Sequence, residues 1–428
     1  MNSTYLQHKF RVPLLPVLLK SILMFFYIYA VSLKVLGIPD VVHSSRLSAV
    51  IILFWGLFSY RKREGFKRLN SKYEYDKVLR LIVITFLYTL VISILIGFGN
   101  GTNYVFTSLD SLLFSILPFV AFLFFFDDID ELAKVIIIVT LLQALCVVLA
   151  TFIPAVSVFF TEVLGTDQGY GENRDLELYR ASYASGLSCF TSEGVCKFTI
   201  GLVACSYKFL STSKIKYIIL YLLFSVVNAM LARTGLIMSL IGVIMMASYY
   251  LRKGRLKFST FVGLVVVTYV SFLIWNNMTS DFYERFKRFN ELKEAEGFDN
   301  FFTAYLSGEF PPISLETIMG TSIISGVSGN GVRVHVDGGY LKNYVALGLP
   351  LAIFTYFYIF RSIFHVLKIF KNTCVYYVIL FYFFYLLFAE FKEYFLLYRG
   401  SIMLFFLFAV LAEKKYCNVG SRLNLINA

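Results

Sequence analysis

Two arginines at the ends of apolar segments are the residues best placed in this sequence to bind an anion. Arg180 and Arg233 each lie where a predicted membrane helix begins, rather than in an open loop. The planar guanidinium group binds phosphate oxygens in a bidentate manner and stays charged at any workable pH. A diphosphate needs more than one such group. The alternative for each is an arginine that extends its head group to the membrane surface.

A histidine and a carboxylate end a long polar segment, directly before another apolar run. His335 and Asp337 are the candidates, because imidazole and carboxylate are the usual groups that remove a proton from a sugar hydroxyl. The sequence leaves open which of the two is the base. His335 has a structural role as its alternative, and Asp337 has the role of helix N-cap.

Further polar side chains fall on the same predicted side of the membrane. Glu193 and Lys197, four residues apart on one helix face, have mutual neutralisation as the alternative to a functional role. Glu390 and Glu393 lie in the last turn on this side. The remaining candidates for substrate binding are Arg174, Arg333, Tyr340, Lys342, Lys392 and Arg399.

Motifs for metal ions, nucleotides and dinucleotides are absent from the sequence. No cluster of His, Cys and Asp has the spacing of metal ligands, and there is no Walker loop or dinucleotide fingerprint. We therefore expect neither a metal site nor a cofactor.

The composition is that of a membrane protein. Of the 428 residues, 58% are apolar, 18% aromatic and 15% charged, whereas a soluble domain is about 45–50% apolar and about 25% charged. The 46 Phe and 30 Tyr residues fall in long runs that one water-soluble core cannot hold. This excludes a soluble enzyme, a disordered chain and a disulfide scaffold.

The apolar runs predict an all-α, polytopic protein with about twelve transmembrane helices in one integral domain, 1–428. A bilayer needs roughly 20 apolar residues per helix. The candidate runs are 14–36, 45–60, 78–98, 109–126, 135–160, 187–210, 217–232, 235–251, 258–275, 340–360, 374–389 and 399–412.

The distribution of Lys and Arg predicts the orientation. The formal net charge is +12. The basic residues gather in every second loop between the predicted helices, such as 61–77, whereas the loops 37–44 and 99–109 hold neither Lys nor Arg. The positive-inside rule then places both termini in the cytoplasm. The acidic turn at 127–131 is cytoplasmic in this scheme. The positive charge reflects topology, so we expect no nucleic-acid partner.

Two segments on the outer side are longer than a turn. The first is 161–186, and the second is 276–339, between helices nine and ten. Within the second, apolar residues at helical spacing from Phe282 to Leu292 predict an amphipathic helix. It suits either the membrane surface or packing on the other helices.

Three segments resemble a known superfamily. Ala232–Leu236, between two helices, resembles the (S/A)RTG turn of O-antigen and capsule repeat-unit polymerases of the Wzy type and of the related O-antigen ligases. Asp337–Pro350 resembles the segment that closes the large periplasmic loop in these proteins, and Arg180–Leu187 is similar to the stretch that opens a mid-chain helix. The layout of twelve helices with one large loop extends the resemblance to the whole chain.

The resemblance implies a metal-independent, GT-C-like glycosyltransferase in the bacterial inner membrane that builds O-antigen or capsular polysaccharide. The donor would be an oligosaccharide on undecaprenyl diphosphate, and the acceptor a sugar hydroxyl of a second lipid-linked repeat unit at the periplasmic leaflet. Arg180 and Arg233 would hold the donor diphosphate and stabilise it as it leaves. A chain-length regulator protein is a further partner that the resemblance suggests.

Two alternative functions stay open. Ligases of the superfamily transfer glycan to the lipid A core and commonly carry a His-Asn pair at the loop end, whereas Val336 and Asp337 follow His335 here. A lipid-linked oligosaccharide flippase would show two pseudo-symmetric halves with polar sites in mid-membrane. We find no such halves in the sequence.

Overall fold

The fold is that of a computed structural model. The described residues are 14–29, 44–58, 75–126, 128–153, 155–156, 159–160, 191–231, 233–254, 314–329, 331, 333–334, 338–371, 373–392 and 401–426. The helices are α1 (Leu14–Ile28), α2 (Ser44–Phe58), α4 (Tyr75–Ile96), α5 (Tyr104–Ser111), the π-helical turn η3 (Leu112–Ile116), α6 (Leu117–Phe125), α7 (Ile129–Phe152), α10 (Thr191–Thr212), α11 (Lys216–Leu231), α12 (Arg233–Arg252), α16 (Leu315–Met319), α17 (Gly339–Leu347), α18 (Leu349–Ile369), α19 (Cys374–Lys392) and α20 (Ser401–Ile426).

The described chain is mostly helical, and five of its helices are long and apolar enough to cross a membrane: α4, α7, α12, α18 and α19. This confirms the prediction of a helical protein embedded in a membrane. Shorter apolar helices lie in several of the other predicted runs. The run at 258–275 lies outside the described residues. The count of twelve spans and the GT-C-like architecture therefore stay predictions.

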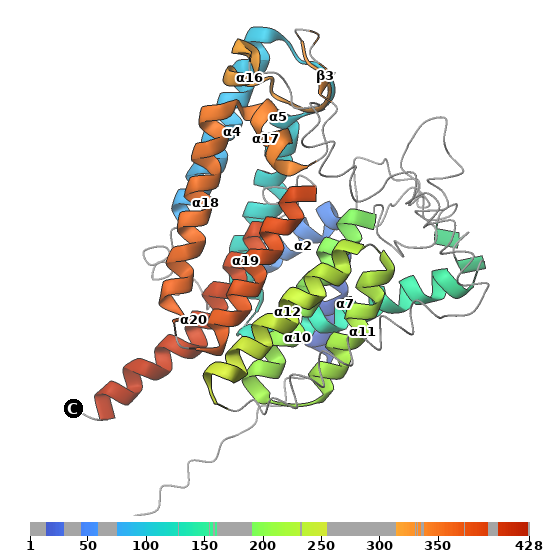
Figure 1. The fold of residues 1–428 in the computed structure, drawn as a ribbon, viewed down its shortest axis with the longest axis vertical. Coiled ribbons are helices and arrows are strands. Elements are labelled where there is room, and N and C mark those ends of the chain that lie inside the picture. Colours follow the sequence, from blue (N-terminus) through green and yellow to red (C-terminus); the bar gives the residue numbers. More distant parts are fainter. Residues whose placement is uncertain are drawn as a thin grey trace, which may run out of the picture.

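Helix α19 is the most enclosed of these long helices. It packs against α10, α12, α17, α18 and α20, and two-thirds of its apolar window is buried (Figure 1). Helices α4 and α18 instead pack against each other and bury one-third of their windows. Leu95 of α4, for example, is 71% exposed. Apolar side chains that stay exposed along such helices suit contact with lipid.

A small antiparallel sheet joins two segments that lie far apart in the sequence. It has the order β1-β2-β3, from β1 (Asn100–Asn103), β2 (Ile323–Val327) and β3 (Arg333–Val334). The backbones of Gly101 and Gly326 pair so closely that a Cβ on either would lie 2.2 Å from a carbonyl oxygen of the other strand. The expectation of an all-α chain is wrong in this detail, since glycine permits a strand contact that the helical pattern does not reveal.

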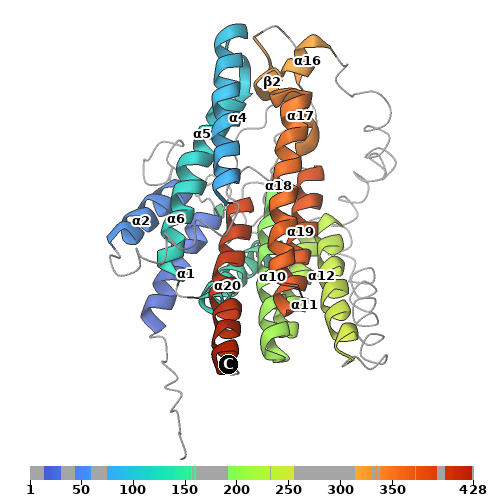
Figure 2. The same cartoon turned by 90° about the vertical axis from the view of Figure 1, so that its left-hand side faces the viewer.

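The sheet lies at one end of the molecule, beside the upper part of α4 and close to α16 and α17, as Figure 2 shows. The buried hydroxyls of Ser93 in α4 and Ser322 beside β2 form a hydrogen bond of 2.7 Å. The end of the predicted large loop is therefore fixed to the connection after α4. The sequence had placed both segments on the outer side of the membrane.

The predicted run at 340–360 is not one helix. It divides into α17 and α18 at Gly348, which adopts φ of 78° and whose Cβ position lies 2.2 Å from the carbonyl oxygen of Ile318. Pro350 then lies in the first turn of α18. The N-cap residue of α17 is Gly338, so the N-cap alternative for Asp337 is wrong. A continuous apolar run cannot show a break that depends on the backbone of a distant segment.

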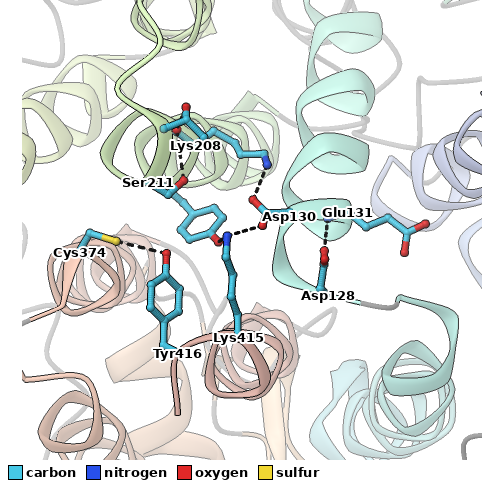
Figure 3. Close-up of polar contacts among 10 residues, drawn as sticks. Asp128, Asp130, Glu131, Lys208, Ser211, Cys374, Lys415 and Tyr416 are labelled. Atoms are coloured by element: carbon cyan, nitrogen blue, oxygen red, sulfur yellow. Dashed lines mark hydrogen bonds and ion pairs between the residues drawn. The ribbon is translucent and has the colours of Figure 1, made fainter. Parts of the chain in front are cut away.

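Ion pairs connect four helices at the end opposite the sheet. Asp130 of α7 binds Lys208 of α10 at 2.5 Å and also binds Lys415 of α20 (Figure 3). Lys20 of α1 lies 2.6 Å from Glu131. The acidic turn therefore carries the partners of three lysines. Asp130, Glu131 and Lys415 belong to segments that the sequence assigns to the cytoplasmic side, whereas Lys20 and Lys208 lie within the predicted membrane runs 14–36 and 187–210.

Candidate functional site

The packing of α12 against α19 determines which helix ends meet. Tyr249 contacts Tyr377 with ring centroids 5.5 Å apart, and a Cβ on Gly242 would lie 2.7 Å from the ring of Phe381. Residue numbers thus rise along one helix as they fall along the other, which makes the pair antiparallel. Since both helices advance about 1.5 Å per residue, the first turn of α12 lies level with the last turn of α19.

Helix α10 begins at the same end. Only 213–215 separate α10 from α11, and only residue 232 separates α11 from α12, so α10 runs parallel to α12. The hydroxyl of Tyr385 in α19 donates to the carbonyl oxygen of Cys196 in α10 at 2.7 Å. The first turns of α10 and α12 and the last turn of α19 therefore share one end of the bundle.

The turn that contains Arg233 is built on a buried asparagine. Nδ2 of Asn228 in α11 donates to Thr199 Oγ1 of α10 at 3.2 Å and to the carbonyl oxygen of Gly235 in α12 at 3.4 Å. A Cβ on Gly235 would lie 2.0 Å from the carbonyl oxygen of Asn228. Glycine at this position therefore lets α11 and α12 approach closely. Arg233 is the first residue of α12, and its side chain lies outside the described part of the structure.

A hydrogen-bonded cluster of three side chains occupies the end of α19: Glu390, Asn343 and the half-buried Tyr356. Oε1 of Glu390 accepts from the Tyr356 hydroxyl of α18 at 2.6 Å and from Asn343 Nδ2 of α17 at 2.9 Å. Asn343 Nδ2 also lies 2.6 Å from the Tyr356 hydroxyl. Both Glu390 and Asn343 are fully buried. Hydrogen bonds of this kind to a buried carboxylate compensate for its removal from water.

The predicted binding residue Tyr340 lies beside this cluster. The ring of Tyr340 is half-buried, 4.9 Å from the ring of Tyr356 and 6.3 Å from that of Phe391. Its hydroxyl donates to the carbonyl oxygen of Leu387 at 3.4 Å. Lys342 is half-buried on α17. The start of α17 and the last turn of α19 are therefore in direct contact.

The other predicted site residues are only partly placed. Arg333 pairs through its backbone with Val327 in the sheet, and Lys392 is the last residue of α19. Their side chains, and that of Glu193, lie outside the description, whereas Lys197 is buried with Nζ 5.6 Å from the Tyr29 ring centroid. The residues that lie wholly outside the described ranges are Arg174, Arg180, His335, Asp337, Glu393 and Arg399, together with the segments 161–186 and 276–313.

Asn343 and Tyr356 are not among the residues that the sequence marks as candidates. Glu390 had drawn attention as a carboxylate at the end of an apolar run, which marks a functional candidate. Its two partners come from the segments on either side of the break at Gly348, and only the folded chain shows that they contact it. Within the described ranges, no group of three or more His, Cys, Asp and Glu side chains could hold a metal ion.

Comparisons with known proteins gave no match to a protein-family model, to a curated protein or to a solved structure.

Proposed function

We propose that this chain is a membrane glycosyltransferase that polymerises undecaprenyl-diphosphate-linked repeat units at the periplasmic leaflet of the bacterial inner membrane. The observation that carries the proposal is that three helix ends with candidate residues lie at the same end of the bundle. The start of α12 with Arg233, the end of α19 with Glu390, and the start of α17 with Tyr340 lie at one end of the bundle. These segments lie far apart in sequence, and their common end supports a site in which Arg233 would bind phosphate and Tyr340 and Glu390 would bind sugar.

The chemistry follows from the residue types. Arg180 and Arg233 would bind the donor diphosphate, and His335 or Asp337 would take the proton from the acceptor hydroxyl. A bond then forms between the acceptor oxygen and the anomeric carbon of the donor, while the bond from that carbon to the diphosphate breaks. The lipid diphosphate leaves with additional negative charge, which guanidinium groups at that position would stabilise.

Replacing Arg233 by alanine tests the proposal. We expect Arg233→Ala to lower chain elongation by about 100-fold or more, because loss of one group that stabilises developing charge has an effect of that order. Cells with this variant should accumulate single repeat units on the lipid. The measurement is the length distribution of lipid-linked glycan, with membrane insertion of the variant verified by protein quantification.

Arg252→Ala provides a matched control, since Arg252 is the last residue of the same helix at the opposite end of the bundle. This variant should give long glycan. Long glycan from Arg233→Ala as well would refute the role of Arg233. Purified wild-type protein given only lipid-linked repeat units distinguishes the polymerase from a ligase, since only a polymerase lengthens them.

A further inference from the structure

The cluster of Asn343, Tyr356 and Glu390 contains a buried acceptor to which no described residue donates. Oδ1 of Asn343 is buried and has no hydrogen-bond partner among the described residues. The amide nitrogen of the same side chain donates to both Tyr356 and Glu390. A buried acceptor without a donor is costly. A ligand hydroxyl is one group that would satisfy it.

The polar groups of the cluster favour a hydroxyl-bearing ligand over a cation. Asn343 Nδ2 and the Tyr356 hydroxyl both direct hydrogens toward Oε1 of Glu390. A cation at that oxygen would face these donors. A sugar hydroxyl can donate to an amide or carboxylate oxygen and accept from a phenol or amide, so it matches both kinds of group present.

An aromatic surface adjoins the polar groups. Tyr340 is half-buried, and its ring lies tilted against that of Tyr356 at a centroid distance of 4.9 Å and edge-on to that of Phe391 at 6.3 Å. Sites for small organic ligands combine aromatic side chains with a few convergent polar groups. The C–H face of a pyranose is apolar and suits such a ring, while its hydroxyls suit the cluster beneath.

We propose that Asn343, Tyr356, Glu390 and the ring of Tyr340 form a subsite for a sugar of the lipid-linked substrate. The inference rests on the proposed function, in which Arg233 binds the diphosphate of the same lipid-linked substrate. Arg233 begins α12, and the start of α12 lies level with the end of α19, where Glu390 lies. The sugar hydroxyls bind the Asn343 amide oxygen and the Glu390 carboxylate, and the sugar ring packs on Tyr340. The subsite selects carbohydrate, whereas the arginines select diphosphate.

Binding measurements with two probes separate these contributions. The probes are undecaprenyl diphosphate without sugar and the lipid-linked repeat units that accumulate in cells carrying Arg233→Ala. Native mass spectrometry of the purified full-length chain gives the affinity for each, and their ratio is the contribution of the sugar. We expect Glu390→Gln to reduce that ratio by about tenfold, in line with loss of a charged hydrogen bond. The affinity for undecaprenyl diphosphate should not change.

Tyr356→Phe and Thr355→Val form a control pair, since each removes one hydroxyl from adjacent positions of α18, half-buried at Tyr356 and fully buried at Thr355. Tyr356→Phe should reduce the ratio about threefold, and Thr355→Val should leave it unchanged. If Glu390→Gln does not fold, the half-exposed Tyr340 offers a second test that removes no buried polar group. Tyr340→Leu should then reduce the ratio on its own.

Two results would overturn the subsite while the proposed function stands. One is equal affinity of the wild-type chain for the two probes, and the other is an unchanged ratio in Glu390→Gln or, where that variant does not fold, in Tyr340→Leu. Failure of the proposed function looks different, since the wild-type chain would then bind neither probe, or no lipid-linked repeat units would accumulate. Either of these results would overturn the subsite as well.

Discussion

At the scale of single residues, Asp130 is the clearest case of one side chain that holds several elements together. It lies at the start of α7 and accepts from Lys208 of α10 and Lys415 of α20, as Figure 3 shows. The Lys208 side chain is 4% exposed. A buried ammonium group that loses its carboxylate keeps the full cost of leaving water. Asp130 therefore stabilises two lysines that would otherwise repel each other.

Removing one partner of a buried ion pair typically costs about 3–5 kcal/mol. Because Asp130 is partly exposed, Asp130→Asn should lower the free energy of unfolding by less, about 2–3 kcal/mol. Asp128→Asn is the matched control. The Asp128 side chain accepts from the backbone N–H of Glu131 at the N-terminus of α7, and asparagine caps a helix as well as aspartate does. Unfolding in detergent micelles measures both. Equal stability of the two variants would contradict the role of Asp130.

At the scale of elements, glycines set where helices stop and how closely they approach. Gly235 allows the contact between α11 and α12, and Gly348 turns the chain from α17 into α18. Gly348 combines a left-handed backbone with close contact to the carbonyl oxygen of Ile318. The break determines which side chains face α19, since Asn343 precedes it and Tyr356 follows it.

Gly348→Ala should destabilise the protein by roughly 2–5 kcal/mol, from left-handed backbone strain of about 1–2 kcal/mol and steric overlap of about 1–3 kcal/mol. Gly254→Ala separates the two effects. Gly254 has φ of 61° after α12, and no atom lies within 4 Å of its Cβ position. This control should show the backbone strain alone, about 1–2 kcal/mol. The same loss for both variants would show that Ile318 does not restrict the joint.

At the scale of the whole molecule, the sheet and the Asp130 ion pairs fix opposite ends of the helical assembly. The sheet connects the segment after α4 with the end of the predicted large loop. The ion pairs connect α7, α10 and α20. Figure 2 shows the two ends, with α16 and β2 at the top and the C-terminal part of α20 at the bottom. Each end joins parts of the chain that the sequence assigns to one side of the membrane.

A cross-link tests the register of the sheet. Thr102 and Ser325 are exposed and directly opposite each other in β1 and β2. Opposed antiparallel residues have Cα atoms about 4.5–5.5 Å apart, within the range that a disulfide spans. Thr102→Cys with Ser325→Cys should therefore form a disulfide on mild oxidation, detected by peptide mass spectrometry.

The control for the cross-link uses a shifted pair. Thr102→Cys with Val327→Cys places the second cysteine two residues along the same face, where diagonal neighbours are about 7–8 Å apart. This pair should form much less disulfide. Equal cross-linking of the two pairs would refute the register between β1 and β2.

The residue types and apolar runs were sufficient to predict a mostly helical membrane protein. They were also sufficient to mark Arg233, Tyr340 and Lys342 as candidates and to place Glu390 at the end of an apolar run. These features are local, because the cost of a polar group in lipid depends on its neighbours along the helix.

Only the tertiary structure decided which of these groups meet. Three features join positions that are far apart in the sequence, and no local pattern predicts them. They are the contacts of Glu390 with Asn343 and Tyr356, the pairing of 100–103 with 323–327, and the break at Gly348. The physical reason is that apolar periodicity specifies a helix and its lipid-facing surface, whereas partner choice between helices depends on close packing and on satisfying buried polar groups.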